Sequence, residues 1–313
     1  MIKFIIKAGV FSLVQLIFSI ILISSSFAAA EKTIGVIMIP NIPYFEEIHK
    51  AFTETLSSEG LTEDKVEIVI QKPLPDPISL LNTVRKFVAI ETDIIVSYGA
   101  PSAMASVSEQ SDIPVVFAGV FDPDAVGLSL KNATGIRSSV PISTLIKKLK
   151  VLSNFSKLGV VYSDIEKDTV MQADEIEKLG NSMGFSSVRF NIRKVKDTEK
   201  ISAVDALILT TSCPATHCVN NIIDIARKAK IPTATLMGGQ GGNGIILTIA
   251  ANPREQGTVA ALLVAKILKG AKASSLSVEQ PRKVDLIINL KEASILGIKV
   301  PFDILSSATK IIK

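Results

Sequence analysis

The sequence predicts an α/β protein of two doubly wound lobes, each a largely parallel sheet covered by helices. Short runs rich in β-branched residues alternate with helical patterns from Thr33 onward. These runs are apolar without polar alternation, which is typical of parallel strands buried on both faces. The 283 residues that follow residue 30 are near the limit of roughly 250–300 residues for one hydrophobic core, so two lobes are favoured over one large sheet.

The expected strands form two series along the chain. The first series is TIGVIMI (33–39), VEIVI (66–70), DIIVSYG (93–99) and IPVVFAG (113–119), and the second is KLGVVYS (157–163), SVRFNI (187–192), VDALILTT (204–211), IPTATLM (231–237) and GIILTIA (244–250). Prolines at 43, 101 and 214 follow strands closely, and proline suits the first turn of a helix. We expect the boundary between the two series near 135–141.

The C-terminal part of the chain adds a helix, a linker, a strand and a final helix. An amphipathic helix is predicted over Pro253–Leu268, followed by Gly270 and a polar Ala/Lys/Ser linker. The segment KVDLIINL (283–290) is the last expected strand, and a last helix follows Pro301. From the pattern alone, this tail belongs to either lobe or to both.

Composition excludes several classes of protein. Hydrophobic residues make up 47% of the chain and its mean hydropathy is +0.40, yet the only apolar stretch near membrane-spanning length is 8–23. A multi-span membrane protein is therefore excluded. The chain has no Trp, 5% aromatic residues and a formal charge of +4, so it lacks the dense basic and aromatic surface that binds nucleic acid.

Residues 1–30 have the pattern of a secretory signal peptide. A start with two lysines precedes the apolar stretch 8–23, and a run of small residues ends at Ala30, near which we place cleavage. No Cys lies near this site, so a lipoprotein anchor is not supported. An uncleaved membrane anchor is the alternative. The sequence thus predicts an exported, periplasmic protein.

Signatures of catalysis and of cofactor binding are missing or out of context. The sequence has no G-x-S-x-G, H-E-x-x-H or Walker A pattern, and its only histidines are His49 and His217, so we predict no catalytic residue and no enzyme activity. The glycines of 239–244 match G-x-G-x-x-G, but the residues after them read as a strand, whereas a dinucleotide site needs a helix there. We therefore predict no cofactor.

The segment from Cys213 to Cys218, which includes His217, raises the questions of a metal and of a disulfide. Structural zinc needs about four ligands and the chain has no second cluster, so no metal site is predicted. An oxidising compartment favours a disulfide. However, a helix that starts at Pro214 holds the two Cα atoms about 8 Å apart, beyond the usual limit of about 7 Å. The disulfide stays an open question.

Ligands of open parallel sheets bind at the carboxyl ends of the strands, which selects the loops after the expected strands. The predicted ligand-binding residues are Tyr44, Tyr98, Gly99, Pro101, Ser102, Gly119, Val120, Asp122, Tyr162, Ser163, Thr211, Ser212 and Gly238. Helix N-termini offer free N–H groups, so SYGAPSA (97–103) and TTSCPA (210–215) could each seat a carboxylate, and Asp122 could pair with an ammonium. An amino acid would use both kinds of contact. The alternative is that the Ser and Thr side chains at these turns merely cap their helices.

Several segments together resemble the ABC transporter substrate-binding family of the type linked to uptake of tryptophan or other aromatic amino acids. The resemblance covers essentially the whole chain after residue 30. Its most specific segments are IPVVFAGVFDP (113–123) and, near the C-terminus, VEQP (278–281) followed by LIINLKEASILGIKVP (286–301). Further segments that carry it are IGVIMIPNIPYFEEIHKAFTETLSSEG (34–60) and DIIVSYGAPSAMAS (93–106).

This resemblance implies a periplasmic binding protein fold of the first type, in which two Rossmann-like lobes joined by three strands hold the ligand in a cleft between them. Lobe 1 would comprise 31–138 and 251–281, and lobe 2 would comprise 139–250 and 282–313. The implied function is capture of a small-molecule solute, an amino acid, and its delivery to an ABC transporter permease and its ATPase. The protein would be a monomer that meets the membrane only through the transporter.

The sequence departs from the family at the cleft. Many members have an acidic residue where this chain has 237–239 (Met-Gly-Gly), and a Ser-Thr pair where it has 210–213 (Thr-Thr-Ser-Cys). Loss of that carboxylate weakens the case for an ammonium contact from lobe 2. Two other classes of function stay as alternatives: a periplasmic sensor that presents its closed state to a membrane receptor, and a secreted enzyme, for which neither histidine has an obvious partner.

Overall fold

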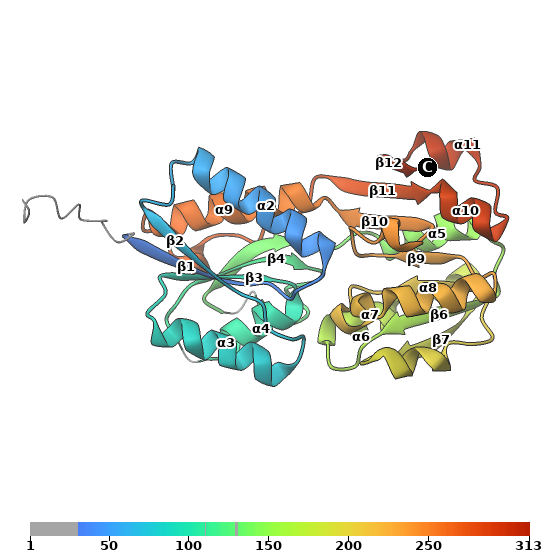
Figure 1. Ribbon diagram of the computed structural model, residues 1–313, viewed down its shortest axis with the longest axis horizontal. Coiled ribbons are helices and arrows are strands. Elements are labelled where there is room, and N and C mark those ends of the chain that lie inside the picture. Colours follow the sequence, from blue (N-terminus) through green and yellow to red (C-terminus); the bar gives the residue numbers. More distant parts are fainter. Residues whose placement is uncertain (1–30, 110, 129–130) are drawn as a thin grey trace, which may run out of the picture.

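The computed structural model describes residues 31–109, 111–128 and 131–313; the predicted signal peptide lies outside the described residues. Two α/β lobes lie side by side along the long axis of the molecule, each built on its own sheet (Figure 1). The predicted fold class, two doubly wound α/β lobes, is confirmed.

Lobe 1 has a five-stranded parallel sheet in the order β2-β1-β3-β4-β5. Its elements are β1 (Lys32–Ile37), α2 (Pro43–Ser58), β2 (Val66–Gln71), α3 (Pro77–Ala89), β3 (Ile94–Tyr98), α4 (Ala100–Ser108), β4 (Val115–Val120) and β5 (Ala133–Arg137). Every residue of β3 and of β4 is buried, as expected for central strands with helices on both faces. The strand β5 was not predicted, because its five residues include a glycine and form no apolar run.

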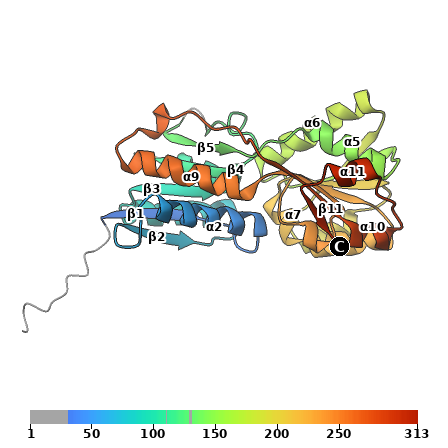
Figure 2. The same ribbon diagram turned by 90° about the horizontal axis from the view of Figure 1, so that it is seen from above.

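Helix α9 (Pro253–Leu268), far along the chain, completes lobe 1 by packing against α2 (Figure 2). A Cβ atom at Gly257 would lie 2.1 Å from the carbonyl oxygen of Ile48, so only glycine permits this close approach of the two helices. Apolar side chains of α9 such as Leu263 and Val264 belong to the lobe 1 core.

Lobe 2 has a seven-stranded sheet in the order β12-β11-β10-β9-β8-β6-β7. Its elements are α5 (Ile142–Leu152), β6 (Lys157–Tyr162), α6 (Lys167–Met183), β7 (Ser186–Asn191), η2 (Val195–Lys200), β8 (Ala206–Leu209), α7 (Cys213–His217), α8 (Val219–Lys228), β9 (Thr233–Thr235), η3 (Gly241–Asn243), β10 (Leu247–Ala251), β11 (Val284–Asn289), α10 (Leu290–Leu296), α11 (Phe302–Ser306) and β12 (Lys310–Ile312). The short helix η4 (Ala273–Ser275) lies against β5 of lobe 1. The sequence did not indicate β12 or α10.

Two neighbouring strands of lobe 2, β11 and β12, run in the direction opposite to the other five. β11 pairs antiparallel with β10, whereas the remaining neighbours in this sheet are parallel. The reason is the path of the chain: β10 leaves lobe 2 for α9, and β11 returns into lobe 2 from the same end of the sheet, without the crossover helix that a parallel neighbour requires.

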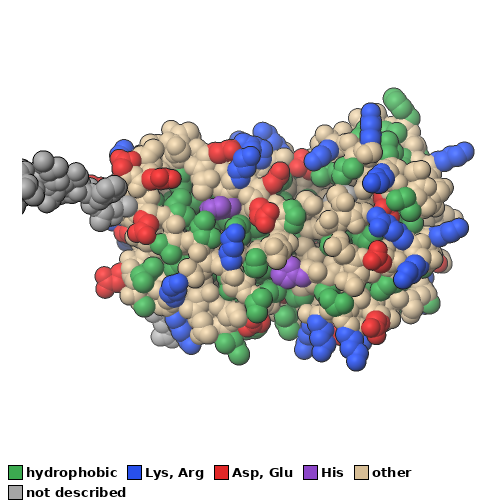
Figure 3. Space-filling view, viewed as in Figure 1, with side chains coloured by type: hydrophobic (Ala, Val, Ile, Leu, Met, Phe, Trp, Pro, Cys, Tyr) green, Lys and Arg blue, Asp and Glu red, His purple; other side chains and the backbone are tan. Residues whose placement is uncertain are grey.

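The chain therefore passes between the lobes three times: after β5, after β10 and before β11. The residue limits that we assigned to the two lobes stay a prediction. Within the described ranges, no helix is both long and apolar enough to cross a membrane. Cationic and anionic side chains are interspersed over the face of both lobes seen in Figure 3.

Candidate ligand cleft between the lobes

The two lobes touch where loops that follow their strands meet. His217 Nε2 donates to the carbonyl oxygen of Pro40 over 2.8 Å, and Tyr44 Oη donates to the carbonyl oxygen of Ala251 over 3.0 Å. A Cβ atom at Gly238 would lie 2.6 Å from the Tyr44 ring. These contacts join α2 and the loop before it to lobe 2, so the cleft between the lobes is closed in this structure.

Two small cavities lie in the closed cleft. The first, which we call the α4 cavity, has a volume of about 250 Å³; its lining is mostly apolar and comprises Pro75, Pro77, Leu80, Leu81, Pro101, Met104, Ala105 and Ser108 of lobe 1 with Ile165 and Glu166 of lobe 2. The second, the α6 cavity, has a volume of about 280 Å³; its lining is Phe121 and Asp122 with Asp168, Met171, Gln172, Asp174, Glu175 and Lys178 of α6. Each volume lies just below the usual range of roughly 300–1,000 Å³ for small-molecule sites, which fits a small solute.

A larger groove on lobe 1 is a weaker candidate site. It has a volume of about 830 Å³ and lies away from the cleft, between α2 and β2. None of the buried polar atoms that lack a hydrogen-bond partner among the described residues belongs to its lining. We therefore build the site from the cleft.

Two buried carboxylates stand at the start of α6, between the two cavities. Glu166 is the N-cap residue of α6 and its two oxygens accept from the backbone N–H of Cys213 over 3.1 and 3.2 Å. Asp168 Oδ2 accepts from Thr211 Oγ1 over 3.3 Å. Burial raises the pKa of both carboxyl groups, and the charge of Asp168 raises the pKa of Glu166 further.

Several buried polar atoms near these carboxylates have no partner among the described residues. They include Ser102 Oγ at the start of α4, Ser163 Oγ directly after β6, and Asp168 Oδ1. Buried polar atoms in folded proteins are nearly always hydrogen-bonded, and a ligand site is one of the places where they are not. Among the described residues, no group of three His, Cys, Asp or Glu could hold a metal ion.

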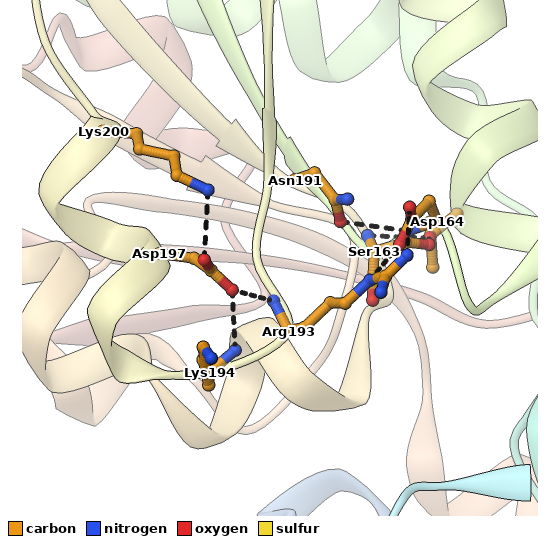
Figure 4. A network of polar contacts seen from close by, with 8 residues as sticks. Ser163, Asp164, Asn191, Arg193, Lys194, Asp197 and Lys200 are labelled. Atoms are coloured by element: carbon orange, nitrogen blue, oxygen red, sulfur yellow. Dashed lines mark hydrogen bonds and ion pairs between the residues drawn. The ribbon is translucent and has the colours of Figure 1, made fainter.

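A surface network fixes the loop that leads from β6 to these carboxylates (Figure 4). Arg193 donates to both oxygens of Asp164, from Nε over 2.6 Å and from Nη2 over 2.5 Å, and Asn191 Oδ1 accepts from the Asp164 N–H over 3.2 Å. Asp197 in turn accepts from the Arg193 N–H over 3.1 Å. The Arg193 guanidinium holds the pKa of Asp164 below its usual range, so this carboxylate is compensated, unlike the two that follow it.

The structure places the predicted site residues in four environments. Pro101 and Asp122 line the cavities, and Tyr44 and Gly238 form the contact between the lobes. Four others are buried residues at the ends of β3 and β4 or directly after them; these are Tyr98, Gly99, Gly119 and Val120. Tyr162, Ser163, Thr211 and Ser212 end lobe 2 strands or follow them, beside the buried carboxylates.

The contacts of the lobe 1 residues show that several already have internal partners. Tyr98 Oη is 3.0 Å from His49 Nδ1, and the Gly119 N–H donates to Gln256 Oε1 over 2.9 Å. Asp122 Oδ1 accepts from the backbone of its own turn, at Asp124 and Ala125.

The capping hypothesis holds for one residue and fails for another. Ser212 is the N-cap of α7, and its Oγ accepts from the Ala215 N–H over 3.3 Å. Ser102 does not cap α4, because the N-cap there is Gly99 and no side chain bonds to the first turn. Thr211 instead bonds within lobe 2: its N–H and Oγ1 both contact the amide of Gln172.

Sequence reasoning missed Glu166 and Asp168. Acidic residues before and within a first helical turn ordinarily interact with the helix dipole in water, so the local pattern gave no reason to bury them. The available signal was their position, only a few residues after the carboxyl end of β6. They are carboxylates of lobe 2 beside the cleft, in a loop other than 237–239, where many family members have an acidic residue.

The two cysteines are both buried and free in this structure. Burial raises the pKa of the Cys213 thiol, and the neighbouring Glu166 carboxylate raises it further. Both effects keep this thiol protonated and unreactive.

The family of the chain follows from comparison with known proteins. The family model described as "ABC transporter substrate binding protein" matches residues 33–312. The chain therefore belongs to the ABC transporter substrate-binding protein family. Members of this family are solute-binding proteins rather than enzymes, in agreement with the lack of catalytic signatures.

The chain is also similar to individual proteins, and the solved structures among them share its fold. A tyrosine-binding protein of Clostridioides difficile is 23% identical over 272 residues, which cover 83% of this chain and 79% of that protein. The solved ABC domain of Streptococcus pneumonia in complex with L-Trp has a TM-score of 0.86 at 23% identity and covers 90% of this chain and 100% of its own. The ligand-free, open structure of a substrate-binding protein of Clostridium difficile has a TM-score of 0.66 at 22% identity, over 90% and 99% of the two chains.

Proposed function

We propose that the protein is exported to the periplasm, captures an amino acid between its lobes and delivers it to an ABC importer. The observation that carries this proposal is the closed cleft with two small cavities, between which a buried carboxylate oxygen of Asp168 has no partner among the described residues. A ligand held there contacts both lobes and so stabilises the closed form, which the transporter would recognise.

The lining of the cleft supports an amino acid with an apolar side chain. The α4 cavity is lined mainly by Pro, Leu and Met side chains, which suit an apolar or aromatic group. Carboxylates at the start of α6 complement an ammonium group. The names of the relatives, one binding tyrosine and one solved with L-Trp, point to the same ligand class.

We further propose which residues contact the ligand. They are the cavity-lining residues Pro101 and Asp122, and the polar residues Ser102, Ser163 and Thr211 beside the carboxylates. The other residues selected from the sequence stay predictions, with Tyr44 and Gly238 acting at the contact between the lobes.

The experiment is ligand binding by protein expressed with its own leader segment. The protein is recovered from the periplasm, its intact mass is measured to locate the cleavage site, and bound solute is identified by native mass spectrometry. The unfolded and refolded, ligand-free protein is then titrated calorimetrically with each of the twenty amino acids, with D-enantiomers as controls.

We expect cleavage near Ala30 and binding of L-tyrosine, L-tryptophan or another apolar amino acid, without binding of the D-enantiomer. If no amino acid binds, the proposed ligand class is wrong. If the mass retains residues 1–30, the proposed cleavage is wrong.

A further inference from the structure

Glu166 and Asp168 are buried negative groups without a positive partner in the part of the chain that the structure describes. The two residues are 3% and 5% exposed. None of the ion pairs between described residues includes either of them. Burying a carboxylate is costly unless a cation or several hydrogen bonds compensate it, and two such groups side by side also repel each other.

The surrounding charges do not supply the missing cation. Arg193 is bound to Asp164, and Arg189 is bound to Asp174 and Glu177. The charged and titratable groups that face the pair from the elements packed around it are the Cys213 thiol of α7, Asp122 of the loop after β4, and Asp174, Glu175 and Lys178 of α6. The lining of the α4 cavity contributes no other titratable side chain than Glu166. Acids thus outnumber the one lysine.

Neutral hydrogen bonds hold the pair in place and leave one oxygen open. Glu166 is held by the N–H of Cys213, and Asp168 Oδ2 by Thr211 Oγ1. Thr211 is itself fixed, because Gln172 Nε2 donates to its Oγ1 over 2.6 Å and its N–H donates to Gln172 Oε1 over 3.0 Å. Asp168 Oδ1 has no partner among the described residues, and Asp168 lines the α6 cavity.

We infer that Glu166 and Asp168 form the seat for a protonated amine of the ligand. The inference rests on the proposed function and names the residues that fix the charge of the ligand. The amine lies against Asp168 Oδ1 and Glu166, and the apolar remainder of the ligand extends into the α4 cavity, whose mostly apolar lining includes Glu166. A neutral sugar or an anion would leave the pair uncompensated.

Burial raises the pKa of both carboxyl groups, and the charge of Asp168 raises that of Glu166 further, so we expect the ligand-free pair to retain a proton at neutral pH, which limits the cost of burying two charges. When the ammonium group enters, the favourable state of the pair is fully ionised, so this proton leaves for the solvent. Binding of the amine is thus accompanied by proton release and weakens as the pH falls.

Three ligands that differ only in their charged groups test the seat. Wild-type protein is titrated with L-tyrosine, with tyramine, which keeps the amine but lacks the carboxylate, and with 3-(4-hydroxyphenyl)propionate, which lacks the amine. We expect the propionate to bind at least about tenfold more weakly than L-tyrosine, since one charge-assisted hydrogen bond carries roughly that factor. Calorimetry in buffers of different ionisation enthalpy should show proton release with L-tyrosine.

Matched variants test whether Glu166 and Asp168 are the residues that bind the amine. Asp168→Asn and Glu166→Gln keep the shape of the side chain and remove the charge, and we expect about tenfold to hundredfold weaker binding of L-tyrosine and of tyramine. Glu177→Gln is the control: it makes the same change on the same helix, at an exposed position that lines neither cavity. It should bind like wild type.

A second measurement needs no amino acid ligand. Methylammonium chloride should raise the Tm of the wild-type protein more than sodium chloride at equal ionic strength, and Asp168→Asn should lose this difference. No extra stabilisation by methylammonium would overturn the seat. Equal affinity for L-tyrosine and the propionate, or wild-type affinity in both charge variants, would also overturn it while leaving the proposed function intact. Stabilisation by methylammonium without binding of any amino acid would instead contradict the proposed function and keep the seat.

Discussion

The segments β3–α4 and β8–α7 occupy equivalent places in the two lobes and share one sequence pattern: a strand, a polar turn, a proline and a helix. Their helix N-termini nevertheless differ. The N-cap of α4 is Gly99, at φ +84°, without a side-chain cap, whereas the N-cap of α7 is Ser212, at φ −68°, with its hydroxyl bound to the helix. The first N–H of α7, at Cys213, is already bound to Glu166.

The comparison shows that a helix N-terminus read from sequence as an anion seat need not be open to a ligand. In lobe 2 the protein's own carboxylate occupies that position, so lobe 2 presents negative charge to the cleft. In lobe 1 no side chain of the described residues caps the first turn of α4. The two sides of the cleft thus differ in charge, which agrees with the proposed zwitterionic ligand.

Exchanging the N-cap residues gives the largest expected effect. Gly99→Ser should lower the free energy of unfolding by about 3 kcal/mol, because the backbone conformation there is nearly restricted to glycine and a Cβ atom would lie 2.7 Å from the Phe45 ring. Denaturant unfolding measures the change. Gly60→Ser, also at positive φ but with open space around it, is the control and should cost less. Equal losses would mean that the Phe45 contact is unimportant.

The carboxylates next to α7 should make stability depend on pH in an unusual direction. Their pKa values are raised in the folded protein, so the folded state binds more protons than the unfolded chain above about pH 4. The free energy of unfolding of the ligand-free protein should therefore fall as the pH rises from about 4 through the raised pKa values, by about 1.4 kcal/mol for each unit of pKa difference.

Thermal unfolding between pH 4 and 9 measures this slope. Glu166→Gln should flatten it, whereas Glu177→Gln should not. A wild-type stability that rises throughout this range would contradict the burial of an uncompensated pair.

His217, at the C-terminal end of α7, should have a smaller and separate effect on closure of the cleft. His217 bonds to Pro40 across the lobes, so His217→Ala should destabilise the closed form by about 1 kcal/mol and weaken ligand binding about fivefold. His217→Gln, which retains a donor, should recover part of the affinity. Small-angle scattering with and without L-tyrosine reports closure; unchanged affinity in the Ala variant would show that this bond contributes nothing to it.

The smallest effect is expected for the reverse exchange, Ser212→Gly. Glycine is itself an acceptable N-cap, so loss of the Ser212 hydroxyl should cost only about 0.5 kcal/mol. Ser212→Ala should cost about 1 kcal/mol, measured by the same denaturant titration. A larger loss in the glycine variant would indicate that Ser212 mainly holds Glu166 rather than α7.

Much of the fold could be predicted from the sequence because its strands are long apolar runs and its helices carry start signals. The helix Pro253–Leu268 was predicted with the limits that the structure shows, and the last helix after Pro301 was also found. The three-residue β12 has no apolar pattern of its own. The antiparallel direction of β11 depends on the path between the lobes, which local periodicity does not encode.

The candidate site was less predictable than the fold, because the hydrogen-bond partners of its side chains lie far away along the chain. The rule that ligands bind after strands selected loops that meet at the contact between the lobes, but it could not show which side chains already have partners. Glu166 accepts from the N–H of Cys213, 47 residues further along the chain. The sequence around Glu166 therefore shows neither that this residue is buried nor that it binds the first N–H of α7. The Ser212 cap, by contrast, is a local contact with Ala215, but the local sequence does not show that Ser102 is left without a partner.

The three passages of the chain between the lobes also constrain the order in which the molecule can form. The lobe 1 core needs α9, and the lobe 2 sheet needs β11, so a nascent chain that ends before residue 253 contains neither lobe complete. Each lobe joins segments that are far apart in the sequence, which slows folding relative to a protein built from local contacts. Synthesis can therefore run almost to the C-terminus before either lobe is able to close its core.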